Sequence, residues 1–173
     1  MGCTSTIVQY LTNNNFDGGA TAWVENGAGY PIILSTSDPM YPLPVTPDSG
    51  IYASWLGGLD NATRSIYQDV AIPVGATNVE LVGVRWIASE ETSTVTDWDT
   101  FTVTIRSTSN TVLETVSSLG NTDQVDLWVP LGGPLSGSYA GQTIRAHFES
   151  NQDFINNTNF FLDTVAVRAT VCQ

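Results

Sequence analysis

The sequence predicts an all-β protein, a β-sandwich of about eight to ten antiparallel strands, because two-residue periodicity recurs along it and useful helical periodicity does not. The clearest case is residues 51–73, where alternating side chains flank a turn that contains Gly, Asp and Asn. Residues 100–106 repeat the alternation, with Phe, Val and Ile on one face and Thr and Arg on the other. Residues 79–88 are apolar on both faces, as in a central strand that is buried on both sides.

The part of the chain before residue 51 has shorter periodic segments. Residues 4–11 are predicted as the first strand, and a run rich in Asn, Asp and Gly at residues 12–19 forms a turn. Residues 28–49 contain five prolines, with a short strand expected at residues 32–34. We interpret the rest of that segment as a long loop, which either covers one end of the sandwich or carries its specificity.

The part after residue 88 alternates loops with strands. An acidic, threonine-rich loop at residues 89–99 precedes the strand at residues 100–106, which pairs with residues 111–116 as a hairpin. The remaining predicted strands lie at residues 127–129, 144–148 and 159–167.

The formal net charge of −12 limits what the domain can bind. The 173 residues include 17 acidic residues and no lysine, so the strong cations are five arginines. Such a surface repels phosphate, which argues against nucleic acid and anionic membranes as partners. No apolar run reaches the roughly 20 residues of a membrane span. We expect a secreted, extracellular protein that binds cations or neutral polymers, and a mature product or excised domain because no signal peptide precedes Cys3.

Three segments carry a resemblance to a known family. They are Trp55-Leu56-Gly57-Gly58 followed by residues 66–77, Leu-Ser-Gly-Ser-Tyr-Ala-Gly-Gln at residues 135–142, and Phe-Phe-Leu-Asp-Thr-Val at residues 160–165. The pattern resembles jelly-roll accessory domains of secreted bacterial hydrolases, which are similar to carbohydrate-binding modules of the galactose-binding-like superfamily. The resemblance implies one jelly-roll domain over residues 1–173 that is not catalytic and can be appended to a catalytic domain.

The same resemblance implies a structural calcium ion. In the family, an acidic residue in an Asn-Gly-x-Phe-Glu-like motif and nearby carbonyl groups hold the ion. Asp17 takes the acidic place here and Asp163 is the acidic residue of the closing motif, with further oxygens expected from the regions of Asn14 and Ser49. Asn14 stands where glycine is usual. The alternative is that both aspartates are ordinary loop or edge carboxylates.

The two cysteines, Cys3 and Cys172, lie at opposite ends of the chain. Because the first and last strands of a jelly roll commonly lie side by side, we expect a disulfide bond between them, and with it an oxidising compartment. Closing so long a loop stabilises the fold by roughly 4–5 kcal/mol in the chain-entropy description. The alternative is two free thiols, or a nucleophile, in a reducing compartment.

A second group of carboxylates, Glu90, Glu91, Asp97 and Asp99, crowds the loop at residues 89–99. Such a group can attract a cation, but we expect a solvated acidic loop.

Sugar binding requires exposed aromatic side chains that stack on C–H faces, with amide and carboxylate groups for the hydroxyls. We expect these aromatics among the loop residues Tyr30, Tyr41, Trp98 and Trp128, with Tyr52 as a further candidate. We expect Trp23, Trp55 and Trp86 in the core.

No arrangement in the sequence supports catalysis, so we do not expect an enzyme. The single histidine, His147, is predicted to face outward, without a Ser or Cys motif nearby. Two classes of function remain. One is an extracellular accessory domain that binds a neutral polysaccharide or glycan. The other is a structural or adhesive surface protein that self-assembles through its sheet edges.

Overall fold

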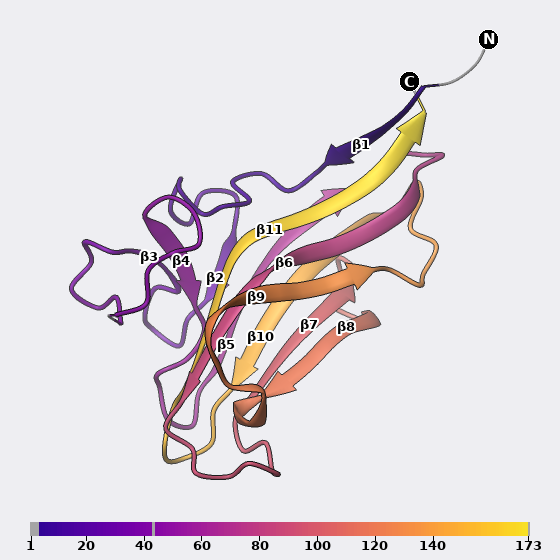
Figure 1. The fold of residues 1–173 in the computed structure, drawn as a ribbon. Helices are drawn as coiled ribbons and strands as arrows, with labels where there is room; N and C mark the ends of the chain where they lie inside the picture. Colours follow the sequence, from indigo (N-terminus) through magenta and orange to yellow (C-terminus); the bar gives the residue numbers. More distant parts are fainter. Residues whose placement is uncertain (1–3, 43, 173) are drawn as a thin grey trace.

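This computed structural model describes residues 4–42 and 44–172, which form eleven strands in two antiparallel sheets (Figure 1). The first sheet contains β1 (Ser5–Gln9), β3 (Ile33–Ser35), β4 (Tyr52–Trp55), β6 (Thr77–Ser89), β9 (Val125–Pro134) and β11 (Thr158–Cys172). The second contains β2 (Val24–Asn26), β5 (Thr63–Ala71), β7 (Thr100–Arg106), β8 (Val112–Gly120) and β10 (Thr143–Asn151). A turn of 3-10 helix at Asn121–Asp123 joins β8 to β9. The predicted all-β sandwich is confirmed.

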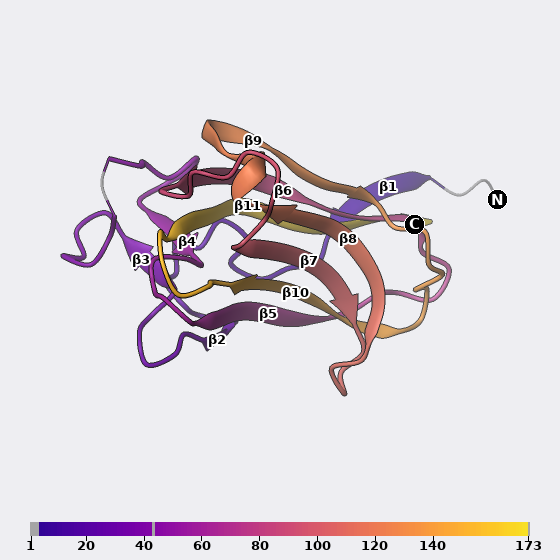
Figure 2. The ribbon, with the colours of Figure 1, turned by 90° about the horizontal axis from the view of Figure 1, so that it is seen from below.

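The strands are ordered so that the last strand lies near the middle of its sheet. The six-stranded sheet runs β3-β4-β11-β6-β9, and β1 pairs with the far half of β11 outside that path. The five-stranded sheet runs β2-β5-β10-β7-β8. Figure 2 shows the two sheets as separate layers, one above the other. β11 therefore holds together three neighbours that come from distant parts of the chain.

The main core fills the space between the two layers. Alternate residues of the long strands point inward, because successive side chains on a strand face opposite sides. Phe101 from one sheet stacks on Phe160 from the other with ring centroids 5.5 Å apart. Trp23 is buried there against Phe148, as expected, at 6.2 Å.

The Trp-Leu-Gly-Gly segment leaves β4 where no side chain larger than hydrogen fits. A Cβ atom on Gly57 would collide with the carbonyl of Thr158, and one on Gly58 would collide with the ring of Trp55. Gly58 also has a φ of +78°, which other residues rarely adopt. These two glycines let the chain pass close to the start of β11.

A row of aromatic side chains crosses the outer face of the six-stranded sheet. We call Trp55, Phe161, Trp86 and Trp128 the aromatic strip. Phe161 is opposite Trp55 on β4 and Trp86 on β6, and the rings of Trp86 and Trp128 are 6.1 Å apart. The strip belongs to a second apolar cluster, separate from the main core. The expectation that Trp55 and Trp86 lie in the core is therefore wrong, since both are only partly buried on an outer face.

Candidate functional site

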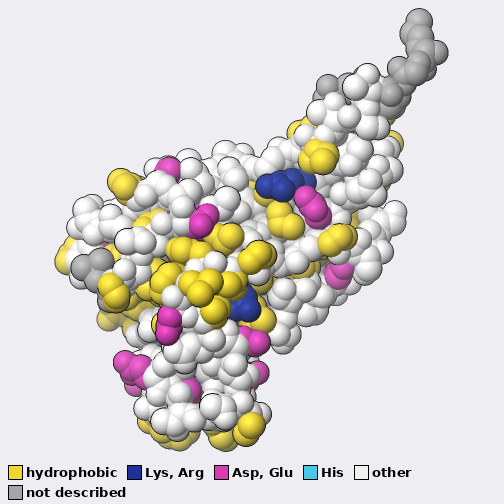
Figure 3. Space-filling view, viewed as in Figure 1, with side chains coloured by type: hydrophobic (Ala, Val, Ile, Leu, Met, Phe, Trp, Pro, Cys, Tyr) yellow, Lys and Arg dark blue, Asp and Glu magenta, His cyan; other side chains and the backbone are white. Residues whose placement is uncertain are grey.

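Two loops at one end of the sandwich enclose a hollow of about 320 Å³. Residues 90–99 connect β6 to β7, and residues 152–157 connect β10 to β11 (Figure 1). Apolar side chains form the rim: Trp98 is 55% exposed, and Phe154 and Ile155 are 65% and 51% exposed. Figure 3 shows hydrophobic side chains gathered at this lower end of the molecule. The polar lining residues are Glu91, Thr92, Asp153 and Asn156.

Asn121 gives the first of these loops its shape. Its side-chain oxygen accepts hydrogen bonds from the backbone N–H groups of Trp98, at 2.8 Å, and Asp99, at 3.1 Å. Its amide donates to the carbonyl groups of Ser93 and Thr96. Because Asn121 is itself only 3% exposed, the loop is closed around a buried amide. The ring of Trp98 is thus carried on an ordered backbone.

Three carboxylates lie together at the hollow, and two of them, Glu91 and Asp153, line it. Each of Glu91, Asp99 and Asp153 has an oxygen within 4.8 Å of the others. The backbone N–H of Asp153 donates to Asp99 Oδ1 at 2.8 Å, which ties the two loops together. Burial of its carboxyl group raises the pKa of Glu91, and the charges of Asp153 and Asp99 raise it further.

The sequence interpretation of this acidic loop was wrong in its membership. Asp97 lies apart from the three, because its Oδ1 accepts hydrogen bonds from the backbone and hydroxyl of Thr122. Asp99 is 1% exposed, so it does not belong to a solvated loop. Asp153 was not predicted as a member because it belongs to the loop at residues 152–157, and no local sequence signal links that loop to residues 90–99.

The other predicted sugar-stacking residues lie elsewhere. Tyr30 is 50% exposed on the loop that precedes β3. Trp128 belongs to the aromatic strip, where its indole N–H donates to the carbonyl of Thr46 at 2.8 Å. Tyr41 is 4% exposed and packs on Phe161, so its ring is not available for stacking. Figure 3 shows the apolar patch around the strip on the face of β11, β6 and β9.

The residues expected to hold calcium gather around the segment at residues 48–51. Asp163 is fully buried and accepts hydrogen bonds from the backbone N–H groups of Ser49, at 2.9 Å, and Thr164, at 2.6 Å. Asp17 accepts one from the backbone N–H of Ile51 at 3.1 Å. The carbonyl of Asn14 accepts a hydrogen bond from the backbone N–H of Val165 at 2.8 Å, so Asn14 lies beside β11, the strand that carries Asp163. The fold thus brings together residues that are more than 100 positions apart in the sequence, such as Ser49 and Asp163.

The charge state of Asp163 reflects this burial. Burial raises the pKa of Asp163 to about 6, although hydrogen bonds from Ser49 and Thr164 oppose the rise. A buried carboxylate with carboxylate, hydroxyl and carbonyl oxygens nearby is chemically suited to a hard cation. The residues therefore fit a calcium ion by donor type.

The outer face of the five-stranded sheet carries a polar cluster around His147. The imidazole stacks on Tyr67 with centroids 5.9 Å apart, and the Arg145 guanidinium lies 3.8 Å from the Tyr67 centroid. Arg145 also binds Asp69 through two nitrogens, at 2.7 and 3.1 Å. His147 faces outward as predicted but is only 3% exposed. Its pKa is lowered to about 4 by burial and by the charges of Arg106 and Arg145.

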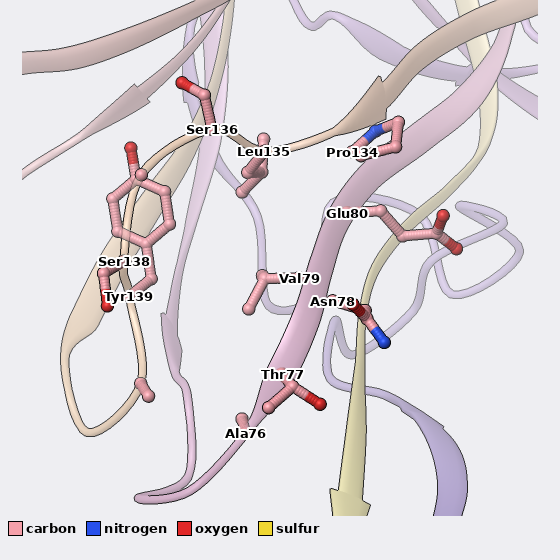
Figure 4. Close-up of a pocket in the computed structure, with 12 residues that line it drawn as sticks. Ala76, Thr77, Asn78, Val79, Glu80, Pro134, Leu135, Ser136, Ser138 and Tyr139 are labelled. Atoms are coloured by element: carbon pink, nitrogen blue, oxygen red, sulfur yellow. The ribbon is translucent and has the colours of Figure 1, made fainter.

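A larger hollow of about 580 Å³ lies between the start of β6 and the segment after β9 (Figure 4). Tyr139 and Leu135 line it opposite Val79. The hydroxyl of Tyr139 donates to Glu114 at 2.8 Å, and Glu114 also accepts the backbone N–H groups of residues 136 and 137. Tyr139 is only 5% exposed, so this hollow offers no open aromatic face.

The expected disulfide lies partly outside the described residues, because Cys3 is not among them. The first and last strands are neighbours as predicted, with Ser5 opposite Cys172. The Cys3–Cys172 bond remains a prediction. Over the described part of the chain, there is no helix long and apolar enough to cross a membrane.

Similar solved structures include carbohydrate-binding modules. One is TmCBM61 in complex with β-1,4-galactotriose, with a TM-score of 0.57 and 12% identity over 96% of this chain and 99% of that chain. Another is the CBM22-1 xylan-binding domain of Xyn10C from Paenibacillus barcinonensis, with a TM-score of 0.54 and 19% identity over 98% and 97% of the two chains.

The fold also matches part of a larger protein. The enzymatically active domain of tailspike protein 4 from bacteriophage CBA120 has a TM-score of 0.58 and 9% identity over 94% of this chain, but only 21% of that chain. No family model and no curated protein matches the sequence. At these identities the likenesses establish the fold alone, a β-sandwich of the kind found in those carbohydrate-binding modules.

Proposed function

We propose that this is a non-catalytic, extracellular domain that binds a neutral glycan in the hollow between residues 90–99 and 152–157. The observation that carries the proposal is the exposed indole of Trp98 beside carboxylate, amide and hydroxyl groups. A pyranose ring presents an apolar C–H face and a rim of hydroxyl groups. This hollow offers a partner for each, since Trp98 and Phe154 are apolar and Asp153 and Asn156 are polar.

The electrostatic environment supports a neutral ligand. A net charge of −12 disfavours polyanions, and the carboxylates in the wall repel sulfate and uronate groups locally. The rim is also prepared before binding, because Asn121 holds the backbone of Trp98. A ligand then pays little entropy for ordering the loop.

Pull-down on insoluble polysaccharides, followed by affinity electrophoresis on soluble ones, tests the proposal. The panel should contain β-1,4-galactan and xylan, because solved structures of similar fold bind β-1,4-galactotriose and xylan. We expect Trp98→Ala to weaken retention at least about tenfold, or about 1.4 kcal/mol. Tyr30→Ala serves as the matched control, because it removes an exposed aromatic far from the hollow in sequence. Its retention should equal that of the wild type.

Two outcomes contradict the proposal. Loss of retention in Tyr30→Ala but not in Trp98→Ala moves the site to the proline-rich loop. No retention on any neutral glycan, together with self-association on size exclusion, favours the structural or adhesive function. A glycan-binding domain can be attached to a catalytic domain, and the sequence of the gene that encodes this chain would show whether it is.

A structural calcium ion at Asp17 and Asp163 is the second part of the proposal. Asn14 and Ser49 would supply further oxygens, and the ion would neutralise the buried carboxylate of Asp163. A ligand of the native state stabilises by about 2.7 kcal/mol at a hundredfold excess over its Kd. Asp163→Ala should therefore lower the melting temperature more in calcium than in chelator, while Asp126→Ala, an exposed carboxylate on β9, should not. An unchanged wild-type melting curve in chelator, with no calcium found by metal analysis, contradicts this site.

A further inference from the structure

We propose that Glu91, Asp99 and Asp153 form a separate calcium site that joins the β6–β7 loop to the β10–β11 loop. The proposal concerns a cation and does not require that the hollow bind a glycan. It uses none of the residues around Asp17 and Asp163.

The spacing of the three carboxylates suits one ion. Calcium takes its oxygen ligands at about 2.3–2.6 Å, so two ligands on opposite sides of the ion are about 4.6–5.2 Å apart. The oxygens of Glu91, Asp99 and Asp153 all lie within 4.8 Å of one another. Magnesium keeps several waters and is usually held by only one or two carboxylates, so a group of three carboxylates favours calcium.

The second observation is a buried oxygen without a donor. Asp99 is 1% exposed, and its Oδ2 has no hydrogen-bond partner, whereas its Oδ1 accepts the N–H of Asp153. Glu91 is only partly buried as a residue, but its Oε1 is buried and likewise lacks a partner. The side-chain oxygen of Asn157, on the same loop as Asp153, is a third such atom. Buried polar atoms are nearly always satisfied by protein, water or an ion, and three buried oxygens without a donor on two facing loops suit a bound cation.

No protein cation fills that role among residues 4–42 and 44–172. The three ion pairs there involve Arg106, Arg145 and Arg168, and none of them includes a carboxylate of this group. Like charges in a partly buried wall repel one another. A divalent cation removes the repulsion and satisfies the oxygens at once. It also fixes the loops that carry Trp98 and Phe154.

Terbium and calcium binding test the site in the intact protein. Terbium is a calcium analogue whose luminescence is sensitised by nearby tryptophan, and Trp98 lines the same hollow as Glu91. We expect a tryptophan-sensitised signal that calcium displaces, and calcium binding by calorimetry. Glu91→Gln and Asp99→Asn should each weaken calcium binding at this site at least tenfold. Glu90→Gln is the matched control, because it removes the same charge from the neighbouring residue.

Separate variants distinguish this site from the one at Asp163. Asp163→Ala should leave the terbium signal in place, whereas Glu91→Gln should remove it without lowering the melting temperature in chelator. Glu91 is on a loop, so this variant keeps the test valid if Asp99→Asn does not fold. Glycan retention is measured separately, in chelator and in calcium. If Glu91, Asp99 and Asp153 bind no calcium, the glycan proposal is still tested by retention alone.

Two results overturn the inference. One is no calcium binding beyond the Asp163 site at millimolar concentrations. The other is equal calcium binding in Glu91→Gln and Glu90→Gln.

Discussion

Asp163 and His147 are both buried ionisable side chains, and protonation affects their contributions to stability in opposite directions. The pKa of Asp163 is raised to about 6, so its folded state binds a proton more tightly than its unfolded state. The pKa of His147 is lowered to about 4, so its folded state binds a proton less tightly. In the wild type the two effects offset each other over much of the same pH range, and single variants are needed to see either.

Asp163→Asn should remove a cost that grows with pH. In chelator, the contribution of Asp163 to the free energy of unfolding falls by about 3 kcal/mol as pH rises from about 4 to about 6, and it stays low above that. Urea unfolding of wild type and variant across this range measures it. With calcium bound at Asp163 the carboxylate is charged in the folded state, so the sign of the slope should reverse. The same slope with and without calcium contradicts the Asp17–Asp163 site.

His147→Gln should remove a loss of stability in acid. Because the folded pKa is lowered from 6.5 to about 4, the stability contributed by neutral His147 is present above about pH 6.5 and is lost as pH falls toward about 4. The full change is about 3 kcal/mol. Chemical denaturation in chelator at about pH 4 and about pH 7 compares the two proteins. An acid-induced loss that is identical in His147→Gln means that the imidazole is already accessible to protons in the folded state.

The sequence predicted single residues well where one local property decided their role. Trp98 was expected to be exposed because it lies in a loop, and it is. Tyr41 was expected to be exposed for a similar reason, but its loop folds back on the aromatic strip and buries it. Local sequence does not show which loop lies over an apolar sheet face.

At the scale of elements, Gly57 links the β4–β5 turn to the start of β11. Gly57→Ala should destabilise the fold by about 1–3 kcal/mol, because the added methyl group meets the carbonyl of Thr158. Gly133→Ala is the matched control, since a methyl group there meets nothing within 4 Å. Its effect should stay within about 0.5 kcal/mol. Equal effects of the two substitutions in denaturant would show that β11 can move away from the turn.

Element prediction succeeded where periodicity was strong. β5 and β7 follow the predicted alternation closely, because one face of each packs in the main core. β9 was predicted over residues 127–129 but spans Val125–Pro134, since Gly132, Gly133 and two prolines interrupt its pattern. β2 has three residues, too few for any periodicity to show. The sequence did not reveal that Glu91, Asp99 and Asp153 lie together, because Asp99 and Asp153 are 54 residues apart and only the fold brings them into contact.

At the scale of the whole molecule, β1 and β11 bring the chain ends together. The register places Ser5 opposite Cys172. If Cys3 and Cys172 are bonded, unfolded and unreduced protein should show no free thiol, and Cys172→Ser should lose roughly 4–5 kcal/mol of stability. Two reactive thiols per chain in that titration contradict the bond. Comparison of Cys172→Ser with reduced wild type separates loss of the bond from loss of the side chain.

The pairing of β1 with β11 also decides how the domain can be tethered. In Figure 1 both strands reach the upper pole, while the loops around the hollow lie at the lower one. Any flexible linker or solid support attached through either end therefore holds the molecule by its base and points the loops outward. A long polymer chain can then pass across the loops without meeting whatever the domain is tied to, and the length of the tether, rather than its point of attachment, sets how far the domain can search.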